Sequence, residues 1–178
     1  MNENRRQILE MLAAGKLTAD IGDFTPGNSY GVGKLPDGSF GVFICYEAIF
    51  PAQVREYTRH GAQLLINISN DGWFGRSSAP AQHIMMARVR AVENRRWLLR
   101  DTNTGVTAAI DPYGRVRESI PRHQVDALPA EFGFRDGITF YTAHGDVFAW
   151  LCAILSIGVM GFSLERGLRP KTESKARS

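Results

Sequence analysis

The chain has 178 residues, enough for one folded domain with its own core and one appended element. Its 44% content of apolar residues excludes an intrinsically disordered chain. Five of the 21 basic residues lie in the last 13 positions, directly after the most apolar stretch, and this clustering argues against a nucleic-acid partner despite the net charge of +3.

The first elements in chain order are a helix, a turn and a strand. Residues 1–20 predict a short helix, and the glycine- and proline-containing residues 21–31 predict a loop. The tripeptide Pro-Asp-Gly at 36–38 is a hairpin-turn signal. Residues 40–45, with the sequence FGVFIC, are nearly all apolar and predict a strand buried on both faces.

Two helices and a strand come next. Residues 51–60 predict a helix, because proline suits the first helical position and a glycine follows the last. Residues 64–68 (LLINI) predict a second buried strand, and residues 70–80 a loop. A second helix is predicted over residues 81–96. We expect one face of this helix to carry four residues at helical spacing, namely Ala81, Met85, Val89 and Val92.

The rest of the domain is predicted to be a run of short strands, at residues 97–101, 105–111, 115–120 and 124–128. Alternating strands and helices followed by hairpins indicate an α/β layered domain with a mixed sheet. We expect this domain to occupy residues 1–131 and a linker to follow over residues 132–146.

Residues 147–164 (VFAWLCAILSIGVMGFSL) run for 18 residues without a charge, near the lower limit for a membrane-spanning helix. The basic segment 165–178 that follows predicts a cytoplasmic tail, which places residues 1–146 on the outer face of the inner membrane. The alternative is the buried helix of a soluble domain.

Cys45 ends a predicted strand at a sharp turn into a helix, where a nucleophile elbow holds its nucleophile. The backbone N–H of Tyr46 would then point toward a developing oxyanion, and Glu47 would orient the site or handle a proton. The second cysteine, Cys152, lies in the apolar segment, so Cys45 has no disulfide partner. Cys45 is therefore either a small core residue or a thiol retained for chemistry.

The loop at residues 70–75 (NDGWFG) is a second signal, because its adjacent aromatic residues either wall a site or cap the core. His83 is expected on the polar surface, with a Cys–His pair as a minor alternative. The cysteines and histidines lack the spacing of a metal site, and we expect no cofactor. Four arginines are expected on a solvated face or as partners of Glu47 and Glu93: Arg88, Arg90, Arg95 and Arg96.

Three segments resemble one family in order and spacing: GVFICYEAIFP (41–51), LLINISNDGWFG (64–75) and the stretch from QHIMM to DPYG (82–114). They are similar to the carbon–nitrogen hydrolase (nitrilase-like) domain of apolipoprotein N-acyltransferase. GDFTPG at 22–27, and TFYTAHGDVFAW with the apolar helix after it, extend the resemblance to about residues 17–165.

The resemblance implies an α/β fold, a partial α-β-β-α sandwich followed by one C-terminal transmembrane helix. It also implies that Cys45 attacks a phospholipid ester and passes the acyl group, as a thioester, to the α-amine of a lipoprotein's diacylglyceryl-cysteine. Tyr46 and Glu47 match positions that the family needs for activity. The loop residues implied to lie near the acyl site are Asn70, Trp73 and Phe74.

Two catalytic residues of that family, a glutamate and a lysine, have no counterpart here. The lysines before Cys45 are Lys16 and Lys34, and neither has the family's surroundings. Half of the sandwich is missing, so the sheet would expose apolar edges. We therefore expect a fragment that is inactive alone. A separate chain that carries the missing part is the expected partner for activity. The alternatives are a non-catalytic membrane-anchored module that binds lipid or lipoprotein, and a nitrilase-type amidase.

Overall fold

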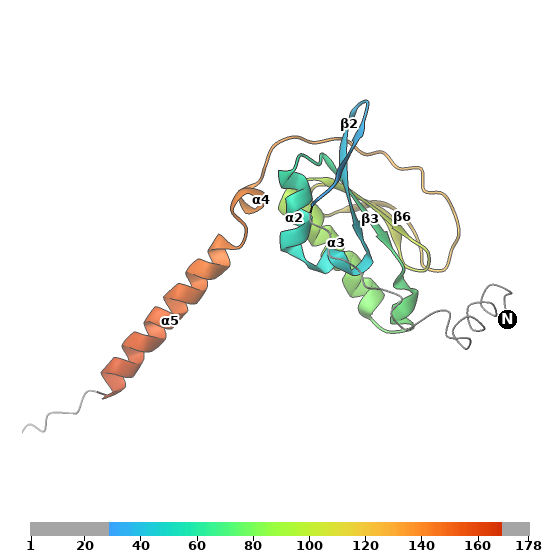
Figure 1. Ribbon diagram of the computed structural model, residues 1–178. Helices are drawn as coiled ribbons and strands as arrows, with labels where there is room; N and C mark the ends of the chain where they lie inside the picture. Colours follow the sequence, from blue (N-terminus) through green and yellow to red (C-terminus); the bar gives the residue numbers. More distant parts are fainter. Residues whose placement is uncertain (1–28, 169–178) are drawn as a thin grey trace, which may run out of the picture. The chain divides into compact units, whose positions relative to one another are not determined.

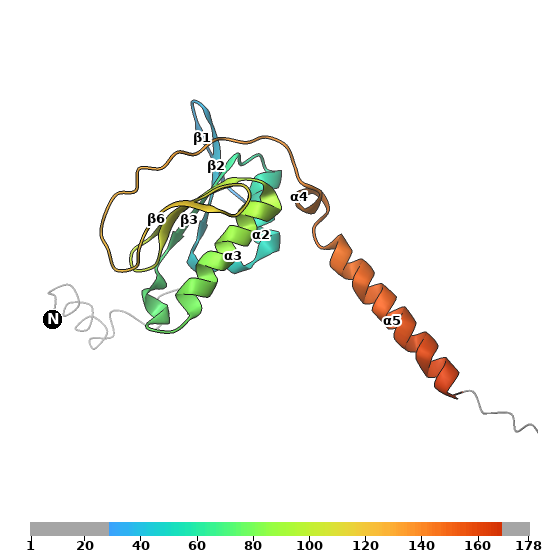
Figure 2. The same cartoon turned by 180° about the vertical axis from the view of Figure 1, so that it is seen from behind.

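The computed structural model describes residues 29–168, with side chains described up to residue 164. The helix predicted over residues 1–20 lies outside the described residues, as does most of the loop after it. The described part contains a six-stranded sheet whose strands follow their order in the chain (Figure 1). The helices between the parallel strands cover one face of this sheet (Figure 2).

The sheet is mixed, as predicted. Strand β1 forms an antiparallel hairpin with β2, strands β2, β3 and β4 are parallel, and β4, β5 and β6 are antiparallel. The strands are β1 (Val32–Leu35), β2 (Gly38–Ile44), β3 (Leu64–Ser69), β4 (Trp97–Thr102), β5 (Thr107–Ile110) and β6 (Val116–Ile120). The helices are η1 (Cys45–Ile49), α2 (Pro51–Arg59), η2 (Asp71–Phe74), α3 (Ala79–Asn94), α4 (Phe140–His144) and α5 (Val147–Leu168).

The strand predicted over residues 124–128 is wrong, because the structure has no strand there. A strand persists only where a neighbouring strand pairs with it, and none of the strands that the structure describes pairs with this segment. The chain instead runs as a coil across the sheet. Its Leu128 and Phe132 help to enclose a cavity of about 310 Å³ against the sheet.

The core lies between the sheet and its helices. Phe43 of β2 and Leu65 of β3 point to this side, where they join Val54 of α2 and Ala87 of α3, and all of them are fully buried. The prediction that β2 and β3 are buried on both faces fails at their C-terminal ends, where Ile44 and Ile68 are 63% and 49% exposed, because none of the helices that the structure describes covers this side of the sheet. The coil covers only part of this face, and the rest is open.

The predicted apolar face of α3 exists, because Ala81, Met85, Val89 and Val92 are all exposed on the same side, but this side points away from the sheet. Met85 and Val89 are 52% and 46% exposed, whereas Ala87 and Ala91 are fully buried. Small side chains let the helix approach the sheet closely, so the larger apolar residues end up on the outer side. The spacing rule identified a real apolar stripe, but not the side on which the sheet lies.

The arginines of this region follow the expectation in part, since Arg95 is exposed and Arg90 has the expected partner Glu93. Arg90 is buried and pairs with Glu93, with Nε of the arginine 2.9 Å from a carboxylate oxygen. Arg96 is buried and donates to the carbonyl oxygens of Ala62, at 2.8 Å, and Gly137, at 2.7 Å. Arg96 therefore connects the end of α3 to the coil at Gly137, whereas the pair of Arg90 and Glu93 lies within α3.

The segment predicted as a linker packs against the domain. Thr139 Oγ1 donates to the carbonyl of Glu93 at 2.6 Å, and Thr142 Oγ1 donates to Asn94 Oδ1 at 3.0 Å. Arg55 of α2 donates to the carbonyl of Thr142 at 3.2 Å. Helix α4 is thereby held against α2 and α3.

Helix α5 contains the predicted apolar segment. Val147–Leu164 has a mean hydropathy of 2.2, and none of it is buried within the structure. By length and composition this helix is able to cross a membrane.

Candidate active site

Cys45 lies where β2 ends and the short helix η1 begins, as the sequence predicts. Its φ is +48°, in the left-handed region that a residue with a Cβ rarely adopts. Such a conformation persists only where the surrounding structure enforces it, and it is typical of functional turns. The half-buried thiol is free.

The two residues after Cys45 are both exposed. The Glu47 carboxylate accepts a hydrogen bond from the backbone N–H of Ile44 at 2.5 Å, so it holds the turn closed. The Tyr46 ring meets the ring of Phe50 edge-on, with centroids 6.1 Å apart. Glu47 is therefore placed to shape the elbow.

The aromatic loop begins directly after β3. Asn70 Oδ1 accepts from the backbone N–H of Gly72 at 3.0 Å, so this side chain caps the helix η2. Phe74 packs edge-on against His83, with ring centroids 5.5 Å apart, whereas Trp73 is 85% exposed. Of the two aromatic rings, only Phe74 covers the interior beside Cys45.

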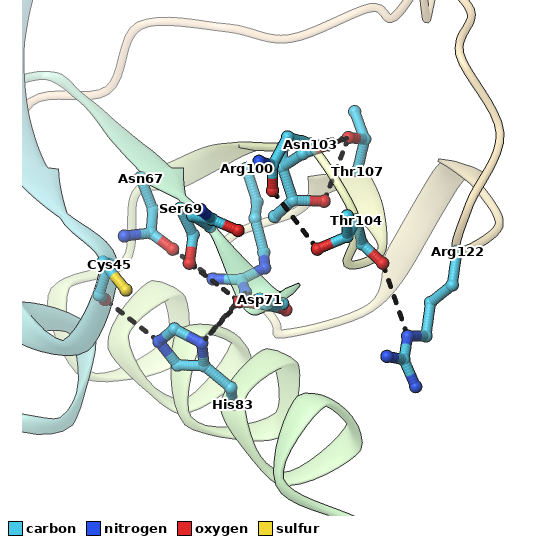
Figure 3. Close-up of polar contacts among 12 residues, drawn as sticks. Cys45, Asn67, Ser69, Asp71, His83, Arg100, Asn103, Thr104, Thr107 and Arg122 are labelled. Carbon is cyan, nitrogen blue, oxygen red and sulfur yellow. Dashed lines mark hydrogen bonds and ion pairs between the residues drawn. The ribbon is translucent and has the colours of Figure 1, made fainter. Parts of the chain in front are cut away.

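A buried polar network lies behind the elbow, and the sequence did not reveal it (Figure 3). Nη2 of Arg100 donates to both carboxylate oxygens of Asp71, at 2.9 and 2.8 Å, and the two side chains are 0% and 1% exposed. Ser69 Oγ donates to the same carboxylate at 2.8 Å. Nη1 of Arg100 donates to the side-chain oxygen of Asn67.

This network sets the charge of Asp71. Burial acts to raise the pKa of the carboxyl group, but the hydrogen bond from Ser69 and the charge and hydrogen bonds of Arg100 outweigh it. The pKa of Asp71 therefore lies below its ordinary value, and the group stays ionised.

His83 belongs to the same network, so the expectation that it lies on the polar surface is wrong. The residue is 2% exposed, with Nδ1 3.0 Å from Asp71 Oδ1 and Nε2 3.0 Å from the carbonyl oxygen of Cys45. The ring contacts the backbone of the cysteine, so this contact differs from the nucleophile–base contact of a Cys–His pair. A signal did exist, because Asn67 and Arg100 are polar positions within otherwise apolar strands.

Two further contacts tie the loops of the site together. A Cβ on Gly105 would meet the carboxylate of Asp71, so the loop after β4 closes over the network only with glycine there. Arg122 donates to the carbonyl oxygen of Gly75 at 3.1 Å. It also donates to the carbonyl oxygen of Thr104 at 3.4 Å (Figure 3). The aromatic loop and the loop after β4 are thus held side by side.

Other groups expected of a site lie elsewhere. Lys34 lies in the edge strand β1, opposite Ser39, and Lys16 lies outside the described residues. Among the residues that the structure describes, no three His, Cys, Asp or Glu side chains are grouped to hold a metal ion.

The sequence model of the carbon–nitrogen hydrolase family matches residues 5–127, more than half of the chain. The chain belongs to the carbon–nitrogen hydrolase family. A nitrilase-superfamily structure from Saccharomyces cerevisiae, a member of branch 10, overlaps it with a TM-score of 0.49 and 26% identity, over 55% of this chain and 39% of that one.

This carbon–nitrogen hydrolase is similar to proteins named apolipoprotein N-acyltransferase. The relative from Geobacter metallireducens is 46% identical over 151 residues, which are 85% of this chain and 29% of the relative. The relative from Thermotoga maritima is 38% identical over 149 residues, 82% of this chain and 29% of the relative. The chain thus spans less than a third of the length of these relatives.

Proposed function

We propose that this chain carries the nucleophile of an apolipoprotein N-acyltransferase. The sulfur of Cys45 attacks the ester carbonyl of a phospholipid and loses its proton to a base, the carbon–oxygen bond breaks, and a lysophospholipid leaves. The α-amine of a lipoprotein's diacylglyceryl-cysteine then attacks the thioester. An amide forms, and the thiol is regenerated. Splitting one difficult transfer into two easier ones is the benefit of the covalent intermediate.

The observation that carries this proposal is Cys45 at a turn with φ +48°, in a chain 38–46% identical to proteins with that name. Tyr46 is proposed to supply the backbone N–H that stabilises the oxyanion, and Glu47 to hold the turn in shape. Trp73 and Phe74, with Asn70 capping their loop, are proposed to border the acyl chain. The apolar helix α5 supports a membrane location, where a phospholipid donor is at hand.

The remaining catalytic groups are proposed to come from residues beyond this sequence. The chain spans 29% of the Geobacter relative, and the open face of its sheet offers an apolar surface that includes Ile44 and Ile68, 63% and 49% exposed. A polypeptide that carries the missing half of the sandwich would cover this face and bring its glutamate and lysine to Cys45.

The test is acylation in membranes. Membranes that contain the chain are given a phospholipid with an alkyne-tagged acyl group, alone and together with a polypeptide that carries the missing half. We expect a hydroxylamine-labile acyl adduct on Cys45. Its acyl group should then transfer to an apolipoprotein substrate. Cys45→Ala should abolish the adduct, and Cys152→Ala, in helix α5, should leave it unchanged.

Each other outcome assigns a different function. Lipid that binds without any adduct, even with the second polypeptide, would make the chain a non-catalytic lipid-binding module. Hydrolysis of small amides without acyl transfer would make it an amidase of the nitrilase type. An adduct that persists in Cys45→Ala would refute the proposed nucleophile.

A further inference from the structure

We propose that His83 is a positioning residue for the acyl-transfer step, holding the peptide between Cys45 and Tyr46 in the orientation that the reaction needs. Asp71 and Arg100, in turn, hold His83. The inference rests on the proposed function in that Cys45 is taken as the nucleophile. It adds a role for three buried side chains that are not part of the implied glutamate, lysine and cysteine set.

The first step of the argument is the contact itself. Nε2 of His83 lies 3.0 Å from the carbonyl oxygen of Cys45. A carbonyl oxygen only accepts hydrogen bonds, so Nε2 carries the proton and donates it. This donor comes from helix α3, 38 residues along the chain, and it contacts the residue whose backbone has the rare conformation.

The second step is the geometry of the peptide unit. The chain has no cis peptide bond among the described residues, so the C=O of Cys45 and the N–H of Tyr46 point in opposite directions from one rigid plane. A donor that fixes the carbonyl on one side therefore fixes the N–H on the other. That N–H is the group proposed to stabilise the oxyanion, so His83 aims it without touching the substrate.

The third step is the rigidity of His83. Its Nδ1 lies 3.0 Å from Asp71 Oδ1 and 3.1 Å from Arg100 Nη2. A protonated Nδ1 donates to Asp71, and an unprotonated Nδ1 accepts from Arg100, so the ring is held in either case. Asp71 is in turn fixed by both Arg100 and Ser69. The ring, 2% exposed and covered edge-on by Phe74, has no room to rotate away from the elbow. The network thus connects strand β4 to the peptide at the site.

This role predicts a selective defect. Attack on an ester passes through a tetrahedral oxyanion, whereas alkylation of a thiol by iodoacetamide is a direct displacement that forms none. Loss of the His83 donor should therefore slow acylation of Cys45 and spare its alkylation. A misplacement of about 1 Å at a reacting centre costs about 100-fold in rate, which sets the scale of the expected effect.

The experiment compares both reactions of Cys45 in the 178-residue chain. p-Nitrophenyl acetate acylates the thiolate, with breakage of the ester bond and release of p-nitrophenolate. This reagent needs neither the lipid pocket nor a second polypeptide, so a failure of the proposed phospholipid reaction would not obscure the result. Peptide mass spectrometry measures both rates at Cys45, with Cys152 as an internal reference thiol. Thermal unfolding of each variant is measured alongside.

The variants differ in whether a donor reaches the Cys45 carbonyl. His83→Leu removes the donor, His83→Asn is polar but too short, and His83→Gln restores an N–H at the same reach. We expect the acylation rate relative to alkylation to fall about 10-fold to 100-fold in the first two variants and to recover in His83→Gln. The exposed Gln82→Leu, on the same helix, should behave as the wild type.

Three results would overturn the proposal. The first is an unchanged ratio of acylation to alkylation in both His83→Leu and His83→Asn. The second is a parallel fall of both reactions that follows the loss of thermal stability, because His83 would then support only the fold. The third is a failure of His83→Gln to recover the ratio while it folds as well as the wild type.

Discussion

Asp71 and Arg100 form an ion pair at the end of β3 that is almost completely removed from solvent. Asp71→Asn would leave the guanidinium buried without its counter-charge, and breaking such a pair from one side costs about 3–5 kcal/mol of the free energy of unfolding. Urea unfolding followed by circular dichroism would measure this loss. The control is Arg59→Gln, because the side chain of Arg59 is 47% exposed and its pair with Glu56 is of the kind that contributes about 1 kcal/mol or less.

The same carboxyl group makes stability depend on pH at the acid end. Because its pKa in the folded chain lies below the ordinary value of 3.8, the folded state binds fewer protons than the unfolded state. The stabilisation is complete above that value and is lost as the pH falls through the folded pKa. We expect Asp71→Asn to reduce the slope of unfolding free energy against pH in this acid range, while Asp111, whose pKa is also lowered, leaves a remaining slope. An unchanged slope would contradict this assignment.

At the scale of elements, helix α3 allows a direct test of which side packs. Ala87 is fully buried against the sheet, so Ala87→Leu should overpack the core and cost about 1–3 kcal/mol. Val89, on the outer side, should accept lysine with a change of about 0.5 kcal/mol or less. Chemical unfolding of the two variants measures both values, and the opposite order would mean that the side of α3 with Val89 packs on the sheet.

The loop after β4 is a second element whose sequence is constrained by its neighbour. Gly105→Ala would place a methyl group against the carboxylate of Asp71, which Arg100 prevents from moving. We expect a cost of about 1–3 kcal/mol and a lower acylation rate at Cys45. Gly31→Ala, where a Cβ meets nothing within 4 Å, is the matched control, and equal thermal stability of the two variants would count against the tight contact.

At the scale of the whole molecule, α5 is expected to anchor the chain in a bilayer. Lysine at Ile154 and Ile157 together should oppose insertion, since one charge near the middle of a spanning helix costs about 2.5–3.5 kcal/mol. Extraction of membranes at alkaline pH should release this double variant and retain the Ile154→Leu, Ile157→Leu control. If the wild type were also released, α5 would not span the membrane.

Local signals in the sequence accounted for most of the fold. The Pro-Asp-Gly turn, the apolar runs of β2 and β3, and the proline and glycine that bound α2 each act through neighbouring residues, so they could be recognised without the rest of the chain. The turn at Cys45 belongs to the same class. The strand predicted over residues 124–128 failed because β pairing depends on a distant partner strand.

What the sequence by itself determined is the order of the elements, the place of Cys45 at the end of a strand and the apolar character of α5. The tertiary structure alone decided which faces are buried and that His83, Asp71 and Arg100 meet behind Cys45. The physical reason is the separation of the partners along the sequence, because these contacts join residues 12 to 38 positions apart. A polar side chain inside an apolar pattern shows that a partner is needed, but only the packing of α3 on the sheet shows which partner it finds.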